Sequence, residues 1–280
     1  MQSLKAVPKG MGAVGRALAF LGLSIFVLGP FAWLVISSFE TRLQLFSRPP
    51  ILLPFPPFLG NYLETLSDPS LLQSLRNSLI VATCTTVAAL LLGSLGAYAF
   101  ARLKVPGKEP LFLAILSTQM LPGIVLLIPL YIIMRSLGLL YTYQGLILAS
   151  LCFTLPYVIW LLRAFFISIP PDIEDAARVD GCSRLGALFR VVIPLSAPGF
   201  VSTGILAFIA GWNEFLTASV MTNNATKTFT VRMAMYIGEE TTSYEHMFAA
   251  AVIGTIPVLL LVIVFQRYIV RGMTEGGVSF

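Results

Sequence analysis

Charged residues are scarce in this sequence. They make up 11% of its 280 residues, whereas a soluble globular domain carries about 25%. Intrinsic disorder needs the opposite composition, with low hydrophobicity and high charge. The scarcity of charge therefore argues against a soluble domain and against a disordered chain.

Cysteine and histidine are also few. The three cysteines, Cys84, Cys152 and Cys182, lack the spacing of a disulfide framework. The single histidine, His246, has no set of clustered ligands beside it, so we expect a surface residue and not a metal ligand. No phosphate-binding G-x-x-x-x-G-K-[ST] loop occurs. We therefore expect no catalytic residue, no metal site and no cofactor held by this chain.

Apolar residues are abundant, at 57% of the chain, and the mean hydropathy is +0.87. A helix that crosses a membrane needs about 20 apolar residues. Six stretches meet this length: about 17–37, 77–100, 110–134, 146–167, 197–221 and 248–269. Their continuous apolar runs are too long for barrel strands. The sequence predicts an all-α integral membrane protein with six transmembrane helices, as a single permease-sized domain over residues 1–280.

The distribution of lysine and arginine predicts the orientation of these spans. With the N-terminus inside, the inner segments carry about twice as many of these residues as the outer segments do. Both termini are then cytoplasmic, and the first span is too long for a signal peptide. The excess of basic residues behind the net charge of +5 is explained by this topology. These residues form no basic stripe, so no nucleic-acid partner is expected.

The inner segment 168–195 has the signals of two short helices. Asp172 is a candidate cap for the first helix, with Glu174 and Asp175 in its first turn. Gly181 can adopt the left-handed conformation that ends a helix, and Ser183 can cap the second helix. Leu185, Leu188, Phe189 and Val192 then form one apolar stripe, which Pro194 ends.

Two interpretations of this helix pair are open. It docks on a partner protein, or it rests on the lipid headgroups. The anionic inner leaflet repels Asp172, Glu174, Asp175 and Asp180, which favours docking on a protein.

The same segment resembles the EAA signature of permease subunits in binding-protein-dependent ABC importers. Asp175, Ala176, Ala177 and Gly181, followed by Val191, Ile193 and Pro194, keep the spacing of that signature, with close replacements at three positions. Asp180-Gly181, the stretch 97–108 (AYAFARLKVPGK) and the stretch 211–216 (GWNEFL) resemble the carbohydrate branch. Among these, the sequence is most similar to the smaller permease of maltose- and trehalose-type importers.

This resemblance implies an ATP-driven sugar importer in the cytoplasmic membrane of a bacterium or archaeon. It implies a homologous second permease, an extracytoplasmic sugar-binding protein and two ATPase subunits that hold the ATP and magnesium. The chain itself is then no enzyme. The residues expected at the ATPase contact are Glu174, Asp175, Ala176, Ala177, Asp180, Gly181, Leu185 and Leu188. The alternative is that these acids only cap and solvate a helix.

Polar residues within the spans are candidates for the translocation path or its gate: Gln119, Thr154, Tyr157, Asn213 and Glu214. Such groups equally form hydrogen bonds between packed helices. Glu214 lies about 27 Å along a continuous helix that starts at Ser196, near the outer edge. Glu214 is therefore either a hydrated residue of the interface, beside the anchor Trp212, or part of an external gate.

The outer segment 236–246 resembles the loop of these permeases that enters the binding protein. Gly238, Glu239 and Glu240 would form its tip, and the alternative is a plain solvated loop.

Two other classes of protein are the rivals. A secondary transporter would show paired ionisable residues in the spans and inverted repeats. An intramembrane enzyme would need converging catalytic groups. The spans offer one peripheral acid and no repeat, so an importer permease is favoured and a secondary transporter is the alternative.

Overall fold

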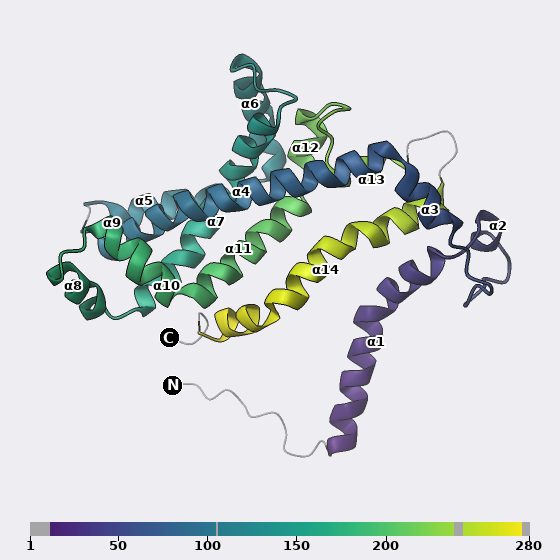
Figure 1. The fold of residues 1–280 in the computed structure, drawn as a ribbon, viewed down its shortest axis with the longest axis horizontal. Helices are drawn as coiled ribbons and strands as arrows, with labels where there is room; N and C mark the ends of the chain where they lie inside the picture. The colour runs from purple at the N-terminus through teal and green to yellow at the C-terminus, as the bar shows by residue number, and fades with distance from the viewer. Residues whose placement is uncertain (1–11, 105, 238–242, 276–280) are drawn as a thin grey trace. The chain divides into compact units, whose positions relative to one another are not determined.

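The computed structural model describes residues 12–104, 106–237 and 243–275 (Figure 1). Every regular element over these residues is helical, so the predicted all-α fold is confirmed. The chain forms two compact units, one of Met1–Asp68 with Tyr236–Ile253 and one of Pro69–Met235 with Gly254–Phe280. The single permease domain stays a prediction, and each unit is described by itself.

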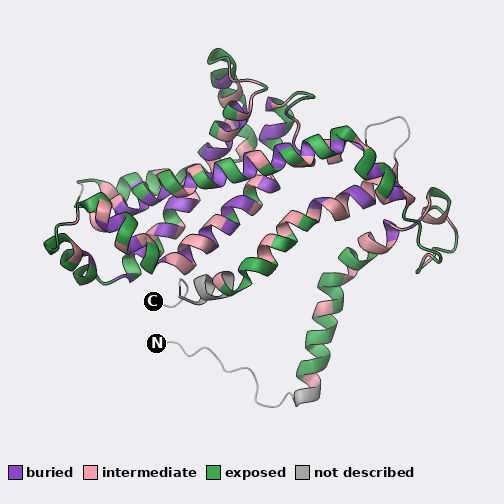
Figure 2. Cartoon of the chain, viewed as in Figure 1, coloured by how far each residue is buried: buried purple, intermediate pink, exposed green. Residues whose placement is uncertain are grey.

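The first unit contains the apolar helix α1 (Ala13–Ser37), the short helices α2 (Arg42–Leu45) and α3 (Gly60–Ser67), and the start of α14 (Tyr244–Glu275). Leu18, Phe20 and Phe26 of α1 are exposed, and exposed residues run along the helix in Figure 2. A helix that is apolar on every side needs lipid or a partner around it. The helix α1 is therefore a candidate membrane span, in agreement with the span predicted at residues 17–37.

The second unit is built on three helices that lie side by side in Figure 1: α4 (Pro69–Arg102), α7 (Tyr143–Ser168) and α11 (Ala197–Trp212). Ala89, Ala97 and Ala207 are fully buried between them. Small residues let helix backbones approach closely in a membrane. The remaining elements are α5 (Lys108–Ser117), η1 (Thr118–Met120), α6 (Gly123–Ser136), α8 (Pro171–Val179), α9 (Arg184–Ala187), η2 (Leu188–Val192), α10 (Ile193–Leu195), α12 (Leu216–Met221), α13 (Phe229–Met235) and the rest of α14.

Four helical stretches are long and apolar enough to span a membrane unbroken: Gly15–Ser37, Pro69–Arg102, Tyr143–Ser168 and Tyr244–Tyr268. Two bent helix pairs bring the number to six among the described residues if each pair counts as one span. The first pair is Lys108–Met120 with Gly123–Ser136, bent by 100°, and the second is Arg184–Leu195 with Ala197–Trp212, bent by 86°. The chain is therefore a multi-pass membrane protein.

The predicted span 110–134 is not a continuous helix. It breaks at Leu121 and Pro122, where Leu121 is extended (φ −76°, ψ 133°) and Pro122 precedes α6. Proline pushes the residue before it out of the helical region and offers no N–H to the helix. The prolines Pro129, Pro156 and Pro257 lie inside helices without such a break.

The predicted span 197–221 is also interrupted, because α11 ends at Trp212 and α12 begins at Leu216. The predicted depth of Glu214, about 27 Å along one continuous helix, is therefore wrong, because the helix ends before this residue. Trp212 is no interface anchor either. It is buried and stacks between Phe208 and Phe229, and its Nε1 donates to the carbonyl oxygen of Gly254 at 3.2 Å.

Candidate functional site

Residues 170–196 fold largely as their local signals predict. Gly181 has φ +90° and separates α8 from α9, and the Ser183 side chain accepts a hydrogen bond from Gly186 N at 3.1 Å. The prediction that Asp172 caps the first helix is wrong. Pro170 occupies the cap without a side-chain bond, and Asp172 lies in the first turn, where a negative charge still complements the helix dipole.

The predicted apolar stripe is only half buried. Leu188 and Val192 are fully buried in the core with Phe166, whereas Leu185 and Phe189 are exposed. The segment η2 is a π-helical turn, and a wider turn shifts the positions that share a face. The helix also continues past Pro194 to Leu195, because a proline in the first turn of a helix needs no donor.

Glu174 is held inside the chain. Its side chain is 9% exposed, and its Oε2 lies 3.1 Å from Nε of Arg102 at the end of α4. The Tyr98 hydroxyl donates a hydrogen bond to the Glu174 carboxylate, and Arg102 also donates to the carbonyl oxygen of Ile169 at 2.7 Å. We call Tyr98, Arg102, Ile169 and Glu174 the clamp. It fixes α8 to the ends of α4 and α7.

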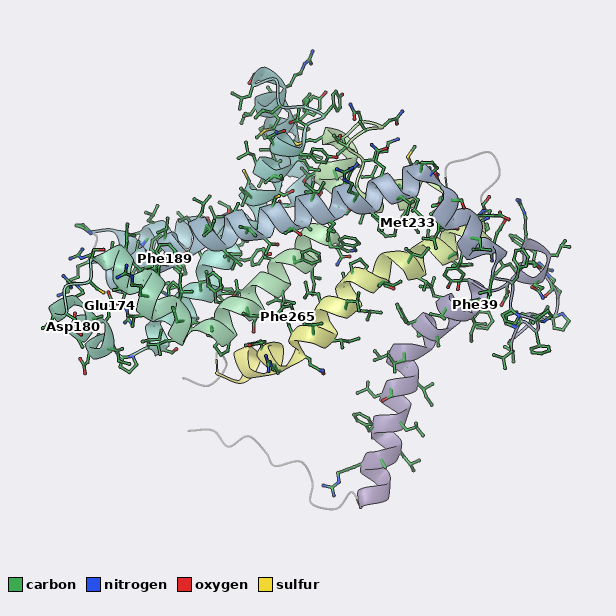
Figure 3. The ribbon with its side chains drawn as sticks, in the orientation of Figure 1. Phe39, Glu174, Asp180, Phe189, Met233 and Phe265 are labelled. Carbon is green, nitrogen blue, oxygen red and sulfur yellow. The ribbon has the colours of Figure 1, made fainter. Side chains whose placement is uncertain are left out.

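The other acids of this segment are exposed. Asp172, Asp175 and Asp180 lie on the surface, and Figure 3 places Glu174 and Asp180 on the same short stretch. Asp175 has one ion pair, to Arg178 of the next turn at 3.8 Å. Such an exposed pair contributes little stability, so Asp175 remains available to a partner.

Apolar side chains accompany these exposed acids. Ile173 is 43% exposed and Val179 is 88% exposed. Ala176 is exposed and Ala177 is half-buried. The outward side of α8 thus combines small residues, exposed apolar residues and acids.

A pocket of about 640 Å³ opens beside the clamp. It is lined by four basic side chains (Arg102, Lys104, Arg178 and Arg184), two acidic ones (Glu174 and Asp175), and Tyr98, Leu103 and Pro171. Its lining is therefore mostly charged and of mixed sign.

Three of the five predicted path residues meet in a second pocket, of about 170 Å³. Thr154, Tyr157 and Glu214 line it together with residues from both interrupted spans. Gln119 and Asn213 do not line this pocket. Gln119 donates to the carbonyl oxygen of Phe153 at 3.0 Å, and Asn213 is an exposed residue at the end of α11.

Glu214 accepts two backbone hydrogen bonds at the start of α12. Thr217 N donates to Oε1 at 2.6 Å, and Ala218 N donates to Oε2 at 3.0 Å. The carboxylate thus satisfies N–H groups that a helix start leaves free. Glu214 precedes the N-cap Phe215, and Glu is not among the residues that usually cap a helix, so the sequence carried no clear signal for this helix start.

Other polar residues serve packing, as the alternative interpretation predicts. Ser202 of α11 donates to carbonyl oxygens of Pro198 and Tyr268. Asn77 of α4 was not singled out in the sequence, yet it donates to Ala225 O and Lys227 O at 3.0 and 2.8 Å. His246 lies at 2.9 Å from the Glu64 carboxylate. Gly238, Glu239 and Glu240 lie outside the described residues.

Solved structures share this fold. The chain aligns with a subunit of a bacterial ABC transporter involved in import of the acidic polysaccharide alginate, with a TM-score of 0.79 and 24% identity. The alignment covers 91% of this chain and 95% of the other.

Sequence relatives cover nearly the whole chain. It is 40% identical over 269 residues to the sulfoquinovosyl glycerol transport system permease protein SmoH of Agrobacterium fabrum, covering 95% of this chain and 94% of the relative. It is 35% identical to the trehalose/maltose transport system permease protein MalG of Thermococcus litoralis, covering 94% and 97%. It is 43% identical over 212 residues to the trehalose transport system permease protein SugB of Mycobacterium tuberculosis, covering 74% and 77%.

The family model named "binding-protein-dependent transport system inner membrane component" matches residues 89–275. This range contains the clamp and both pockets described above. The chain belongs to the family of binding-protein-dependent transport system inner membrane components.

Proposed function

We propose that this chain is the sugar-conducting permease subunit of an ATP-driven importer in a bacterial or archaeal cytoplasmic membrane. Three of its relatives are named as permeases for sulfoquinovosyl glycerol, trehalose/maltose and trehalose. Their names support a glycoside or disaccharide as substrate. As a member of its family, the chain is a permease subunit and not itself an enzyme.

The partners in this proposal are a homologous second permease, an extracytoplasmic binding protein and two ATPase subunits. The ATPases bind ATP and magnesium, because the sequence of this chain has no phosphate-binding loop. The family description supports the binding protein. Gly238, Glu239 and Glu240 are proposed to reach it from the outside, with both termini of the chain in the cytoplasm.

The coupling role rests on the difference between the two sides of α8, one of which contacts the spans while the other is exposed. Glu174 faces inward and is tied to Arg102, while Asp175 and Asp180 face outward with Ile173 and Val179. One side of the helix is thus fixed to the spans, and the other is left for a partner. We infer that the ATPase contacts Asp175, Asp180 and the neighbouring small residues, and that Glu174 passes the movement of α8 to α4.

The test is sugar uptake by the complete importer in proteoliposomes. Purified permeases, ATPases and binding protein are reconstituted, and uptake of radiolabelled trehalose and maltose is measured with ATP or with a non-hydrolysable analogue inside the vesicles. We expect uptake only with ATP. Uptake that follows an ion gradient without ATP would support a secondary transporter instead.

A further inference from the structure

The pocket of about 170 Å³ forms where the two interrupted spans meet. Gly123 lies directly after the break at Pro122, and Glu214 and Leu216 lie at the break between α11 and α12. Ser150, Thr154 and Tyr157 of α7 complete its polar lining, and Phe153 supplies an aromatic ring. Irregular backbone within a membrane is stable only where protein buries it or where it lines a hydrated cavity.

The pocket is large enough to hold several waters. One water requires about 15 Å³ of such space, and this pocket offers about 170 Å³. Its polar lining could satisfy several waters or the hydroxyl groups of a ligand.

The Tyr157 hydroxyl makes no hydrogen bond of good geometry within the described chain. Its oxygen is buried and has no hydrogen-bond partner. The Thr154 side chain lies close to Tyr157 but donates its own proton to the carbonyl oxygen of Ser150 at 2.8 Å. A buried hydroxyl without a partner is costly, so a group that enters the pocket and bonds to it is stabilised there.

The lining suits a neutral polyol. A sugar hydroxyl both donates and accepts hydrogen bonds, as the hydroxyls of Tyr157 and Thr217 do, and the Glu214 carboxylate accepts them. The Glu214 oxygens already accept from the α12 backbone at 2.6 and 3.0 Å, so this carboxylate is held in place before a ligand arrives. The Phe153 ring offers an apolar face for a sugar ring.

We propose that this chain itself contacts the sugar, through a hydroxyl-binding subsite formed by Tyr157, Thr154, Thr217 and Glu214 between the interrupted spans. The proposal rests on the proposed function and adds to it that this subunit recognises the substrate directly. Tyr157 is its clearest member, because its hydroxyl is buried beside Thr154 and makes no hydrogen bond of good geometry within the described chain.

The test compares Tyr157→Phe with the matched variant Tyr131→Phe in the reconstituted importer. Tyr131 belongs to α6, does not line the pocket and undergoes the same loss of one hydroxyl. We expect Tyr157→Phe to lower the maximal uptake of trehalose or maltose about fivefold, the effect of one hydrogen bond. Insertion and ATPase recovery stay unchanged, and Tyr131→Phe transports like the wild type.

Labelling of Ser150→Cys provides a readout independent of transport. In a variant without the three native cysteines, we expect a small hydrophilic thiol reagent to modify this position, and trehalose or maltose trapped by the importer to slow the modification. A pocket that stays unlabelled is dry, and this result would overturn the subsite. Labelling that no sugar slows would show a hydrated space without a sugar contact, which also contradicts the proposal.

The uptake data separate the two levels of the proposal. If the wild type transports sugar and Tyr157→Phe equals Tyr131→Phe, the subsite is wrong and the importer function stands. If the wild type transports neither sugar under any energy source, this chain does not conduct trehalose or maltose, and the subsite for these sugars is wrong with it.

Discussion

Glu174 illustrates how one side chain joins a surface helix to the spans. It is the only buried acid of α8, and it meets both Tyr98 and Arg102 of α4. Removal of one partner of a buried ion pair costs about 3–5 kcal/mol, because the other charge stays buried and unpaired. The clamp is therefore the residue-scale basis of the proposed coupling.

Glu174→Ala is expected to loosen α8 without unfolding the spans. A loss of about 3 kcal/mol corresponds to an increase in local opening of about 100-fold. Hydrogen–deuterium exchange of the backbone amides of residues 172–179 in the detergent-solubilised complex measures this opening. Asp172→Ala is the control, because Asp172 is an exposed residue of the same helix. This variant should change the exchange of the α8 amides far less. Equal exchange in the two variants would contradict the clamp.

Glu40 has a different environment, with 3% exposure and an unpartnered Oε1. Burial raises the pKa of Glu40 above its ordinary value of 4.5. The folded state therefore binds this proton more tightly than the unfolded state does. The resulting stabilisation is complete below about pH 4.5 and is lost as the pH rises through the folded pKa.

Glu40→Gln, which is neutral at every pH, should consequently be more stable than the wild type at about pH 8. The advantage should shrink as the pH falls towards about 4. Thermal unfolding of both proteins across this range measures the difference. A wild type that is the more stable of the two at about pH 8 would show that the Glu40 charge is compensated.

At the scale of elements, the turn between α8 and α9 depends on Gly181. Its φ of +90° is unfavourable for residues with a Cβ, although a Cβ there would meet no atom within 4 Å. The cost of Gly181→Ala is therefore conformational, about 1–2 kcal/mol, and Gly181→Asn should cost less. ATP-driven uptake measured for both variants checks this prediction, since Gly181→Asn should retain more uptake than Gly181→Ala. An alanine variant equal to the asparagine variant would mean that the turn adopts another conformation.

The outward side of α8 carries the proposed ATPase contact. Asp175→Lys should reverse the charge at the interface and reduce the amount of ATPase recovered with the permease at least tenfold. Asp175→Glu, which keeps the charge and adds one methylene, should retain the ATPase. The measurement is the ratio of ATPase to permease after affinity purification. Full recovery with Asp175→Lys would remove Asp175 from the contact.

The sequence predicted those elements whose signals are local. Ser183 and Gly181 mark the boundaries of α8 and α9 from within a few residues. The break at Pro122 was not predicted, because the apolar run 110–134 continues on both sides of this proline. The partner of Glu174 was not predictable, since Arg102 is distant in the sequence and only the packing of α4 against α7 brings it near. The π-helical turn at 188–192 depends equally on this packing, so the exposure of Leu185 and Phe189 was missed.

At the scale of the whole molecule, hydropathy predicted the apolar stretches but not their continuity. Four stretches form unbroken spanning helices among the described residues, and the third and fifth are bent or interrupted. The mean hydropathy of an apolar stretch does not reveal a break in the helix, because one Pro or one Glu hardly changes this mean. The interruption at Glu214 thus brings a polar group among apolar helices, and three predicted path residues converge there.

We propose that this chain works as the membrane part of an ATP-driven complex. The most direct measurement is to purify the chain from its native membrane in mild detergent and identify the accompanying proteins by mass spectrometry. We predict a second permease and an ATPase in stoichiometric amounts, with the ATPase lost in Asp175→Lys. A chain that is recovered alone, or only with copies of itself, would contradict the account.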